Sequence, residues 1–270
     1  MAESPLDLGP RCGNSVTPPR LRKDFGVDKV SIRAEAATTP IVVNTYFHIV
    51  ANSTRVSDGY LTNSTILAQF NVLHNAFLPS GILLNFIGYT RTVNKIWATS
   101  IHPSDHLLMK KYLRRGDYST LNIYFRTVVG VYDESPNRGL LGLCTLPWNY
   151  AVGSDPFWDD GCMVLHTTVP GGTDNQGYNM GITTVHEVGH WMGLSHTFEG
   201  GCLGGGDFVA DTPAEKDEAR GCPVGRDTCP GRIGVDPVNN YMDYMSDACR
   251  DTFTVGQAAR MRALWNLYRA

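Results

Sequence analysis

Apolar residues follow two different periods along residues 41–168, and the change of period predicts where strands and helices lie. Residues 61–77 have apolar side chains at helical spacing and predict a helix, the spaced residues being Leu67, Phe70, His74 and Phe77. Short runs rich in β-branched and aromatic residues predict strands at 41–50, 82–89, 121–129, 140–146 and 162–168. This mixture of strands and helices indicates a domain built on a mixed sheet.

Three further helices complete the pattern. One is predicted at 104–115, with Ser104 as its cap and Gly116 just past its end. Another spans about 182–193, and an amphipathic stretch at 254–268 closes the chain as a helix. Between these last two, residues 199–251 show no periodic pattern, and so long a loop in a compact domain is expected to be functional or covalently held.

The N-terminal forty residues carry scattered prolines and charges with little apolar periodicity. We therefore expect residues 1–40 to form a flexible extension, with residues 41–270 as the folded domain. Its upper subdomain would cover about 41–196 and its lower subdomain about 197–270.

Composition excludes several classes of protein. With 42% hydrophobic and 18% charged residues in 270, the chain can bury a core and is not a disordered tail. A net charge of −3 without a basic block argues against a nucleic-acid or membrane-surface partner. Its apolar runs are far shorter than the roughly 20 residues of a membrane span.

Cysteine usage points to an oxidising compartment. Four of the seven cysteines fall among Gly, Pro and Asp residues between Cys202 and Cys249, as in loop-rich regions stapled by disulfides. A Cys-rich zinc knuckle is the alternative, but no tight Cys-x-x-Cys pair is present. Met1–Leu8 has no basic start and no apolar stretch, so no secretory signal is visible in this chain.

The most specific chemistry lies in the string His-Glu-Val-Gly-His-Trp-Met-Gly-Leu-Ser-His at residues 186–196. On a helix, His186 and His190 project from one face and can reach one metal ion. Glu187 points about 100° away, where it can take a proton from water at the metal. Gly193 can end the helix and turn the chain, so that His196 completes three imidazoles and leaves a fourth position open, as in catalytic zinc sites.

A second pair of histidines has the same spacing. His102 and His106 are also four apart, but Pro103 and Ser104 place the first before its helix begins, and no third ligand or catalytic Glu follows. We interpret both as surface or capping residues.

The full string resembles the zinc motif of the metzincin metalloproteases. Further matches are Asn240-Tyr-Met-Asp-Tyr-Met245, Asp211-Thr-Pro213 and the ending Phe253-Thr-x-x-Gln-x-x-Arg-Met261. Together with His190–Phe198 they make the chain similar to the pappalysin family, close to its secreted microbial members. The resemblance covers about 41–268, with its specific motifs all after Thr183.

The resemblance implies an α+β fold, in which a mixed twisted sheet with a backing helix and an active-site helix lies above an irregular, disulfide-stapled C-terminal subdomain. It also implies that Met242 is the methionine of the turn beneath the metal and that Tyr244 stabilises the oxyanion, as a hydroxyl donor can. Met245 is a rival for the turn that spacing alone does not exclude.

The same resemblance implies the disulfides Cys202–Cys229 and Cys222–Cys249 and a calcium site in the acidic loop. The candidate calcium ligands are Asp207, Asp211 and Thr212, with Glu199 less clearly indicated, since Ca²⁺ prefers carboxylate, hydroxyl and carbonyl oxygens. A merely solvated acidic loop is the alternative.

The remaining cysteines allow a third disulfide and a switch. Cys144 and Cys162 flank a loop and can pair. Cys12 then stays unpaired, and its thiolate can occupy the fourth zinc position in a latent precursor, matured between Arg20 and Pro40. An odd thiol or an intermolecular disulfide is the alternative.

These features predict a secreted zinc-dependent endopeptidase made as a zymogen, which acts on proteins or peptides with Glu187 as general base. Two other classes remain open: a zinc-holding binding module that no longer cuts peptides, and a metalloenzyme acting on a non-peptide bond. The presence of Glu187 argues against the first, and the methionine turn and the family resemblance argue against the second.

Overall fold

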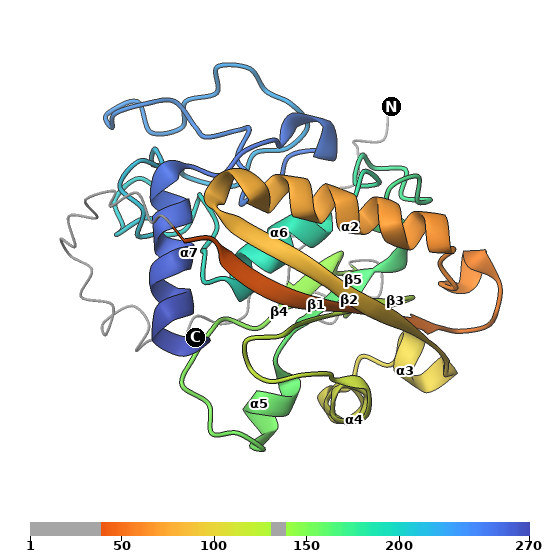
Figure 1. The fold of residues 1–270 in the computed structure, drawn as a ribbon. Helices are drawn as coiled ribbons and strands as arrows, with labels where there is room; N and C mark the ends of the chain where they lie inside the picture. Colours follow the sequence, from red (N-terminus) through yellow and green to blue (C-terminus); the bar gives the residue numbers. More distant parts are fainter. Residues whose placement is uncertain (1–38, 131–138) are drawn as a thin grey trace, which may run out of the picture.

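The computed structural model describes residues 39–130 and 139–270. Its centre is a five-stranded mixed sheet in the order β2-β1-β3-β5-β4 (Figure 1). The strands are β1 (Ile41–Ala51), β2 (Ile82–Val93), β3 (Leu121–Arg126), β4 (Gly142–Cys144) and β5 (Cys162–Leu165). All neighbours pair in parallel except β4, which runs antiparallel to β5 at the edge of the sheet. The α+β class and the mixed sheet predicted from the sequence are therefore confirmed.

Helices cover both faces of the sheet. On one face lie α2 (Asn63–Phe77) and α6 (Ile182–Trp191), which pack with β1 and β3 in the larger hydrophobic core. On the other lie α3 (Lys95–Thr99), α4 (Pro103–Leu113) and α5 (Asp155–Asp159), whose inward residues include Met109 and Leu113. Figure 1 shows these two layers on opposite sides of the twisted strands. The central strand β3 is thus buried on both faces, as is typical of parallel strands, whereas the edge strand β2 stays partly exposed.

Phe47 marks the centre of the larger core. Its fully buried ring makes edge-to-face contacts with Phe70 of α2, Phe86 of β2 and Phe125 of β3, with ring centroids 5.1–6.3 Å apart. Such pairs contribute beyond the area that they bury. This cluster fixes α2 to the sheet as a backing helix.

Two details of the predicted helices are wrong. Leu67, assigned to the apolar face of α2, is 51% exposed, and Ile66, Gln69 and Leu73 are buried instead, because the packed face is turned by about one residue. In α4 the N-cap is His102 with Pro103 in the first turn, not Ser104, since proline suits the first helical position.

In the second His-x-x-x-His pair, one of the two histidines is not at the surface as expected. His102 lies before the helix, but His106 is buried, and its Nε2 lies 2.8 Å from the Ser100 carbonyl oxygen. His106 therefore serves the packing of α3 against α4.

After α6 the chain is irregular until α7 (Val255–Tyr268), apart from a short 3₁₀ turn at Asp247–Cys249. Three disulfides are present: Cys144–Cys162 between β4 and β5, and Cys202–Cys229 and Cys222–Cys249 in the irregular region. The two disulfides of the irregular region are the pairs that the family resemblance implied, and Cys144–Cys162 is the third pair that the sequence allowed. The subdomain boundary at residues 196/197 stays a prediction, and Cys12 lies outside the described residues.

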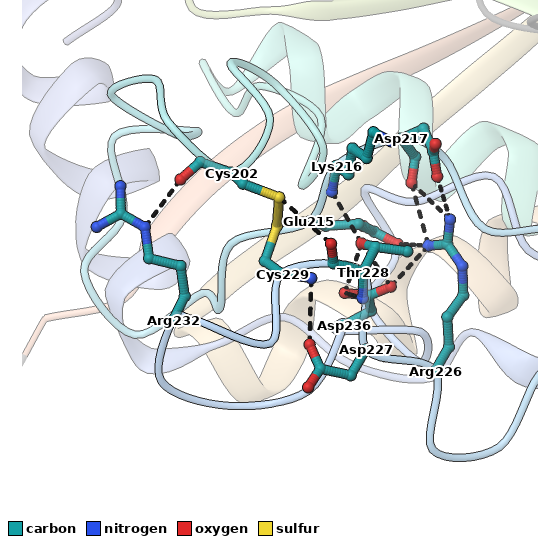
Figure 2. The surroundings of a disulfide bond; sticks show 10 residues. All are labelled: Cys202, Glu215, Lys216, Asp217, Arg226, Asp227, Thr228, Cys229, Arg232 and Asp236. Atoms are coloured by element: carbon teal, nitrogen blue, oxygen red, sulfur yellow. Dashed lines mark hydrogen bonds and ion pairs between the residues drawn. A yellow bond between two sulfur atoms is a disulfide. The ribbon is translucent and has the colours of Figure 1, made fainter.

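A charged network reinforces the irregular region beside the Cys202–Cys229 disulfide (Figure 2). The Arg226 guanidinium pairs with Glu215 at 2.6 Å, with Asp236 at 2.8 Å and also with Asp217. Asp236 accepts hydrogen bonds from the backbone and side chain of Thr228. Cross-links of this kind replace the hydrophobic core that so loop-rich a segment lacks.

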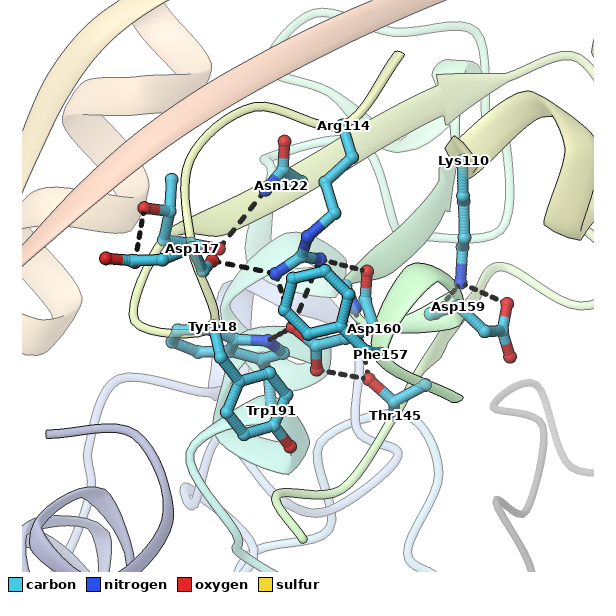
Figure 3. A network of polar contacts seen from close by, with 12 residues as sticks. Lys110, Arg114, Asp117, Tyr118, Asn122, Thr145, Phe157, Asp159, Asp160 and Trp191 are labelled. Carbon is cyan, nitrogen blue, oxygen red and sulfur yellow. Dashed lines mark hydrogen bonds and ion pairs between the residues drawn. The ribbon is translucent and has the colours of Figure 1, made fainter. Parts of the chain in front are cut away.

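A second buried network centres on Asp160, and Figure 3 shows Arg114, Thr145 and Trp191 around it; Arg269 joins this network to the C-terminus. The fully buried Asp160 carboxylate accepts hydrogen bonds from Trp191 Nε1 at the end of α6, from Thr145 and from Arg269. Arg114 of α4 donates to the Asp160 carbonyl oxygen at 2.9 Å. The Arg269 guanidinium also stacks 3.7 Å above the Trp191 ring. Residues distant in sequence thereby fix the C-terminal end of α6.

Among the described helices, none combines the length and the apolar character that crossing a membrane would need.

Candidate active site

The active-site helix α6 is buried along its whole length. Gly181 precedes it in the left-handed region (φ 87°), and its backbone N–H donates to the Thr168 carbonyl oxygen. At the other end Gly193 has φ 97°, a conformation that glycine adopts without strain, and its N–H donates to the His190 carbonyl oxygen. This glycine ends the helix and turns the chain back so that His196 reaches the same site.

Three imidazoles converge at this point. His190 Nε2 lies 3.2 Å from His186 Nε2 and 3.0 Å from His196 Nε2. The Nδ1 atoms of His186 and His190 each lie 2.8 Å from a backbone carbonyl oxygen, of Tyr241 and Leu194 respectively. A carbonyl can only accept, so these Nδ1 atoms carry the protons, and the Nε2 lone pairs of the same rings point inward.

This donor set fits a zinc ion. Two nitrogens bound at 2.0–2.1 Å to a tetrahedral zinc would lie about 3.3 Å apart, close to the spacings observed. Unprotonated nitrogens facing one another repel unless a cation lies between them, and second-shell carbonyls that fix the tautomer are typical of metal-binding histidines. In the described ranges, no other group of three or more His, Cys, Asp or Glu side chains gathers closely enough to hold a metal.

Burial keeps these histidines in the neutral form that binds metals. It lowers the pKa of His190 to about 4. It also holds the pKa values of His186 and His196 well below the usual range, and the neighbouring imidazoles lower these two pKa values further. Near neutral pH all three are therefore ready to act as ligands.

Glu187 follows His186 on α6 and lies against the edge strand β4. Its side chain is 1% exposed. A Cβ atom at Gly142 would overlap the Glu187 carboxylate, so that only glycine fits at this position of β4. Gly142 was not predicted as a site residue, because nothing local to residues 140–146 indicates contact with a residue 45 positions later.

Met242 lies beneath the same helix. A Cβ atom at Gly189 would overlap the Met242 sulfur, which explains the glycine between the two helical histidines. Asn240 holds the turn through paired amide hydrogen bonds to Gln257 of 2.8 and 3.0 Å, and also accepts from the Met242 N–H. Met245 is equally buried, but the sulfur that approaches Gly189 of α6 is that of Met242.

The Tyr244 hydroxyl lies 3.1 Å from His196 Nε2, which places it at the edge of the histidine cluster. Its ring packs against Phe198, which stacks on His196 with centroids 4.8 Å apart and planes inclined by 7°. The backbone carbonyl of Tyr244 accepts from the Tyr178 hydroxyl at 2.8 Å. The tyrosine side chain is therefore positioned beside the inward-facing nitrogens.

The loop after His196 is held by a residue that the sequence did not point to. Thr197 donates to the buried Glu215 carboxylate at 2.9 Å, and Glu215 pairs in turn with Arg226. Burial, helped by nearby Asp243, raises the pKa of Glu215 to about 8. This chain of contacts links the third histidine to the disulfide-stapled region of Figure 2.

The expected calcium ligands do not come together as one carboxylate cluster. Asp211 is used as a cap of α7, accepting from Thr254 Oγ1 at 2.7 Å and from the Gly256 N–H at 2.8 Å. Asp207 is buried, and burial raises its pKa to about 7. The Thr212 hydroxyl lies beside the Asp207 carboxylate and acts to lower its pKa, although burial outweighs it; neither Asp207 Oδ2 nor Thr212 Oγ1 makes a hydrogen bond of standard geometry.

Comparisons with known proteins agree with this geometry. The family profile described as pregnancy-associated plasma protein-A matches residues 171–266, which include all three histidines. An extracellular metalloprotease of Colletotrichum graminicola is 48% identical over 235 residues, covering 87% of this chain and 80% of that protein. Extracellular metalloprotease 1 of Coccidioides posadasii is 43% identical over 275 residues, covering 100% of this chain and 94% of that protein.

Solved structures show the same likeness. Mirolysin in complex with a compound superposes with a TM-score of 0.70 at 26% identity, covering 86% of this chain and 94% of the other. Mature mirolysin of Tannerella forsythia with a cleaved peptide gives 0.65 at 26% identity, covering 84% and 92%. With a shared fold, relatives of 43% and 48% identity and a histidine cluster suited to metal, this chain belongs to the pappalysin family of metzincin metalloendopeptidases.

Proposed function

We propose that the protein is a zinc-dependent endopeptidase in which His186, His190 and His196 hold the metal and Glu187 is the general base. The observation that carries this proposal is the convergence of three buried imidazoles, in which His190 Nε2 lies 3.2 Å from His186 Nε2 and 3.0 Å from His196 Nε2. Zinc, when bound, supplies a Lewis acid and lowers the pKa of water.

Glu187 and Tyr244 carry the proton and charge steps in this proposal. The Glu187 carboxylate accepts a proton from the attacking water and passes it to the leaving amine. The Tyr244 hydroxyl, at the edge of the histidine cluster, donates a hydrogen bond to the oxyanion that develops on the scissile carbonyl. Met242 supports the floor of the site through its contact with α6.

Metal removal tests the ligand assignment. We expect chelation to abolish cleavage of casein and one equivalent of zinc to restore it. His190→Ala should lose both zinc and activity, whereas His102→Ala, in the exposed first position of the second His-x-x-x-His pair, should keep both. Cleavage that persists in zinc-free protein would contradict the proposal.

A zinc-holding module without peptidase activity is the alternative. It predicts that wild type binds one zinc per chain and cuts no unfolded protein or peptide. The similarity of this chain to relatives that are named extracellular metalloproteases favours the peptidase.

Secretion and latency form a separate part of the proposal. The three disulfides and the extracellular relatives support secretion. Cys12, with a thiolate suited to zinc, would hold a precursor inactive. Full-length Cys12→Ser should then be active without N-terminal trimming, and equal latency of both proteins would refute the switch.

Calcium is proposed as a structural ion at Asp207 and Thr212. Their buried oxygens, which make no hydrogen bond of standard geometry, support it, because a cation would satisfy both and favour the ionised carboxylate. We expect calcium to raise the melting temperature of wild type but not of Asp207→Asn; an equal rise in both would contradict the site.

A further inference from the structure

Tyr244 is held by hydrogen bonds at both of its peptide groups. Its backbone N–H donates to Asp243 Oδ1 at 2.7 Å, and its carbonyl oxygen accepts a hydrogen bond from the Tyr178 hydroxyl at 2.8 Å. All three residues are buried. Because the peptide groups on either side of the Tyr244 Cα atom are fixed, the place of its hydroxyl is set by the torsions of its own side chain.

Tyr178 reaches Tyr244 from the segment that leads into the active-site helix. It precedes Ile182, the first residue of α6, and is 6% exposed. Tyr178 and Tyr244 also line the same small pocket as His186 and Glu187. One hydroxyl therefore connects the start of α6 with the chain that follows the methionine turn.

Further hydrogen bonds make this connection rigid. The Met180 N–H donates to Asp247 Oδ2 at 2.8 Å, and the Asp247 N–H donates to the Gly177 carbonyl oxygen at 2.9 Å. Arg250 holds the second segment together, since its guanidinium donates to Asp247 Oδ1 at 2.8 Å and to the Asp243 carbonyl oxygen at 3.1 Å. The chain on both sides of Tyr178 is thus fastened to the segment that carries Tyr244.

The Tyr244 hydroxyl has a narrow target in the proposed mechanism. It lies 3.1 Å from His196 Nε2, and a donor stabilises an oxyanion only when it is aimed at the place where the charge develops. Without the hydrogen bond from Tyr178, the peptide group after Tyr244 could rotate and carry the Cα atom with it. Small displacements of a catalytic group lower the rate strongly.

We propose that Tyr178 is a positioning residue for peptide hydrolysis, whose hydroxyl fixes the backbone of Tyr244 and thereby aims the Tyr244 hydroxyl at the oxyanion. This inference rests on the proposed peptidase function. Because Tyr178 acts through Tyr244, its effect on catalysis should disappear once the Tyr244 hydroxyl is removed. A merely structural role predicts instead that the losses of the two hydroxyls act independently.

Tyr178→Phe removes the hydroxyl and keeps a ring that fills the same space. With N-terminally trimmed, zinc-loaded protein and one peptide derived from casein, we expect kcat to fall by about tenfold, because a misplaced donor weakens binding of the transition state. KM and zinc content should stay unchanged. Tyr89→Phe is the matched control, since its hydroxyl donates to Asn63 Oδ1 at 2.9 Å from β2, at the other edge of the sheet from β4. A kcat of Tyr178→Phe equal to that of this control would overturn the proposal.

A phosphinic peptide gives a readout that does not depend on turnover. Its tetrahedral phosphinate resembles the oxyanion, and such analogues report the interactions made in the transition state. Calorimetric titration of the zinc-loaded proteins should give a Kd that rises in Tyr178→Phe by about the factor by which kcat falls. Tyr89→Phe should bind the phosphinic peptide as wild type does. An unchanged Kd in Tyr178→Phe would contradict the positioning role.

A double-mutant cycle with Tyr244→Phe separates positioning from a general loss of structure. Adding Tyr178→Phe to Tyr244→Phe should change kcat by less than about twofold. If the two substitutions instead lower kcat by factors that multiply, Tyr178 does not act through Tyr244 and the inference fails alone. A zinc-loaded wild type that cleaves nothing would overturn the peptidase function, and this inference with it.

Discussion

Single residues set the geometry around Glu187, and Gly142 does so most directly. A methyl group at Gly142 would occupy the space of the Glu187 carboxylate. The three atoms that lie nearest to such a methyl group all belong to Glu187 and none to a histidine. A substitution there should therefore displace the general base while leaving the metal ligands in place.

We expect Gly142→Ala to lower kcat/KM by about 10- to 100-fold, because small displacements of a catalytic group are costly, with zinc content unchanged. Gly139→Ala is the control, since a Cβ atom there meets nothing within 4 Å. Steady-state kinetics and zinc analysis check this prediction. Equal activity of the two variants would show that Glu187 is not confined as described.

His48 is a second residue with a measurable consequence. It is buried between Thr90 and Asn122, with its ring nitrogens 2.9 and 3.0 Å from their side chains. Burial lowers its pKa to about 4, and Arg115 and Arg114 act in the same direction. The unfolded chain therefore takes up a proton at His48 before the folded protein does as the pH falls from about 6.5 to 4.

Acidification should accordingly destabilise wild type more than His48→Gln. Between pH 7 and pH 5, the free energy of unfolding contributed by His48 should fall by about 2 kcal/mol, given about 1.4 kcal/mol per pKa unit. Urea denaturation of both zinc-loaded proteins at the two pH values gives the difference. A difference that is independent of pH would contradict the assigned pKa direction.

Residues in a fixed local pattern were predictable from the sequence. The three histidines and Glu187 lie within eleven residues, and helical spacing with Gly193 as a turn is enough to bring them together. Gly142, Glu215 and Arg250 were not predicted as site residues, because each reaches the site from another part of the fold. The sequence also suggested Asp211 as a calcium ligand, and this stays a prediction; its carboxylate accepts two hydrogen bonds at the start of α7.

At the scale of elements, Asp160 joins α4, α6 and the C-terminus (Figure 3). Burial alone would raise the pKa of Asp160, but Arg269 and Arg114 outweigh it and the net direction is down. The carboxylate is therefore charged and compensated. Removing the charge would leave buried guanidinium groups unpaired, which is much more costly than losing an exposed ion pair.

Asp160→Asn should lower the free energy of unfolding by about 3 kcal/mol. Lys111→Ala removes an exposed ion pair with Asp155 from the same region and should change it by less than about 1 kcal/mol. Chemical denaturation of both variants compares the two. Similar values for both would mean that the buried network does not stabilise the end of α6.

The types of the principal strands and helices were predicted from periodicity, and their bounds shifted by a few residues. The short helices α3 and α5 were missed, because five residues are too few to show a helical period. The apolar face of α2 was misplaced, since the polar Gln69 is buried by a hydrogen bond to the Gly181 carbonyl oxygen rather than by hydrophobicity.

At the scale of the whole molecule, a rigid layered sheet positions α6, and a cross-linked irregular region brings Met242 and Tyr244 up to it. The first part is encoded in periodic sequence and was predictable in outline. The second is stabilised by two disulfides and the Arg226 network instead of regular structure, so its detailed path had no periodic signal. The site forms where the two parts meet.

The central claim is that zinc and Glu187 together hydrolyse peptide bonds at this junction. The most direct test compares casein cleavage by N-terminally trimmed wild type and Glu187→Ala, each with its zinc content measured. We predict one zinc per chain in both proteins and a loss of cleavage of at least about 1000-fold in the variant, as expected for removing a general base from a preorganised site. Comparable cleavage by zinc-loaded Glu187→Ala would contradict the assignment of the general base.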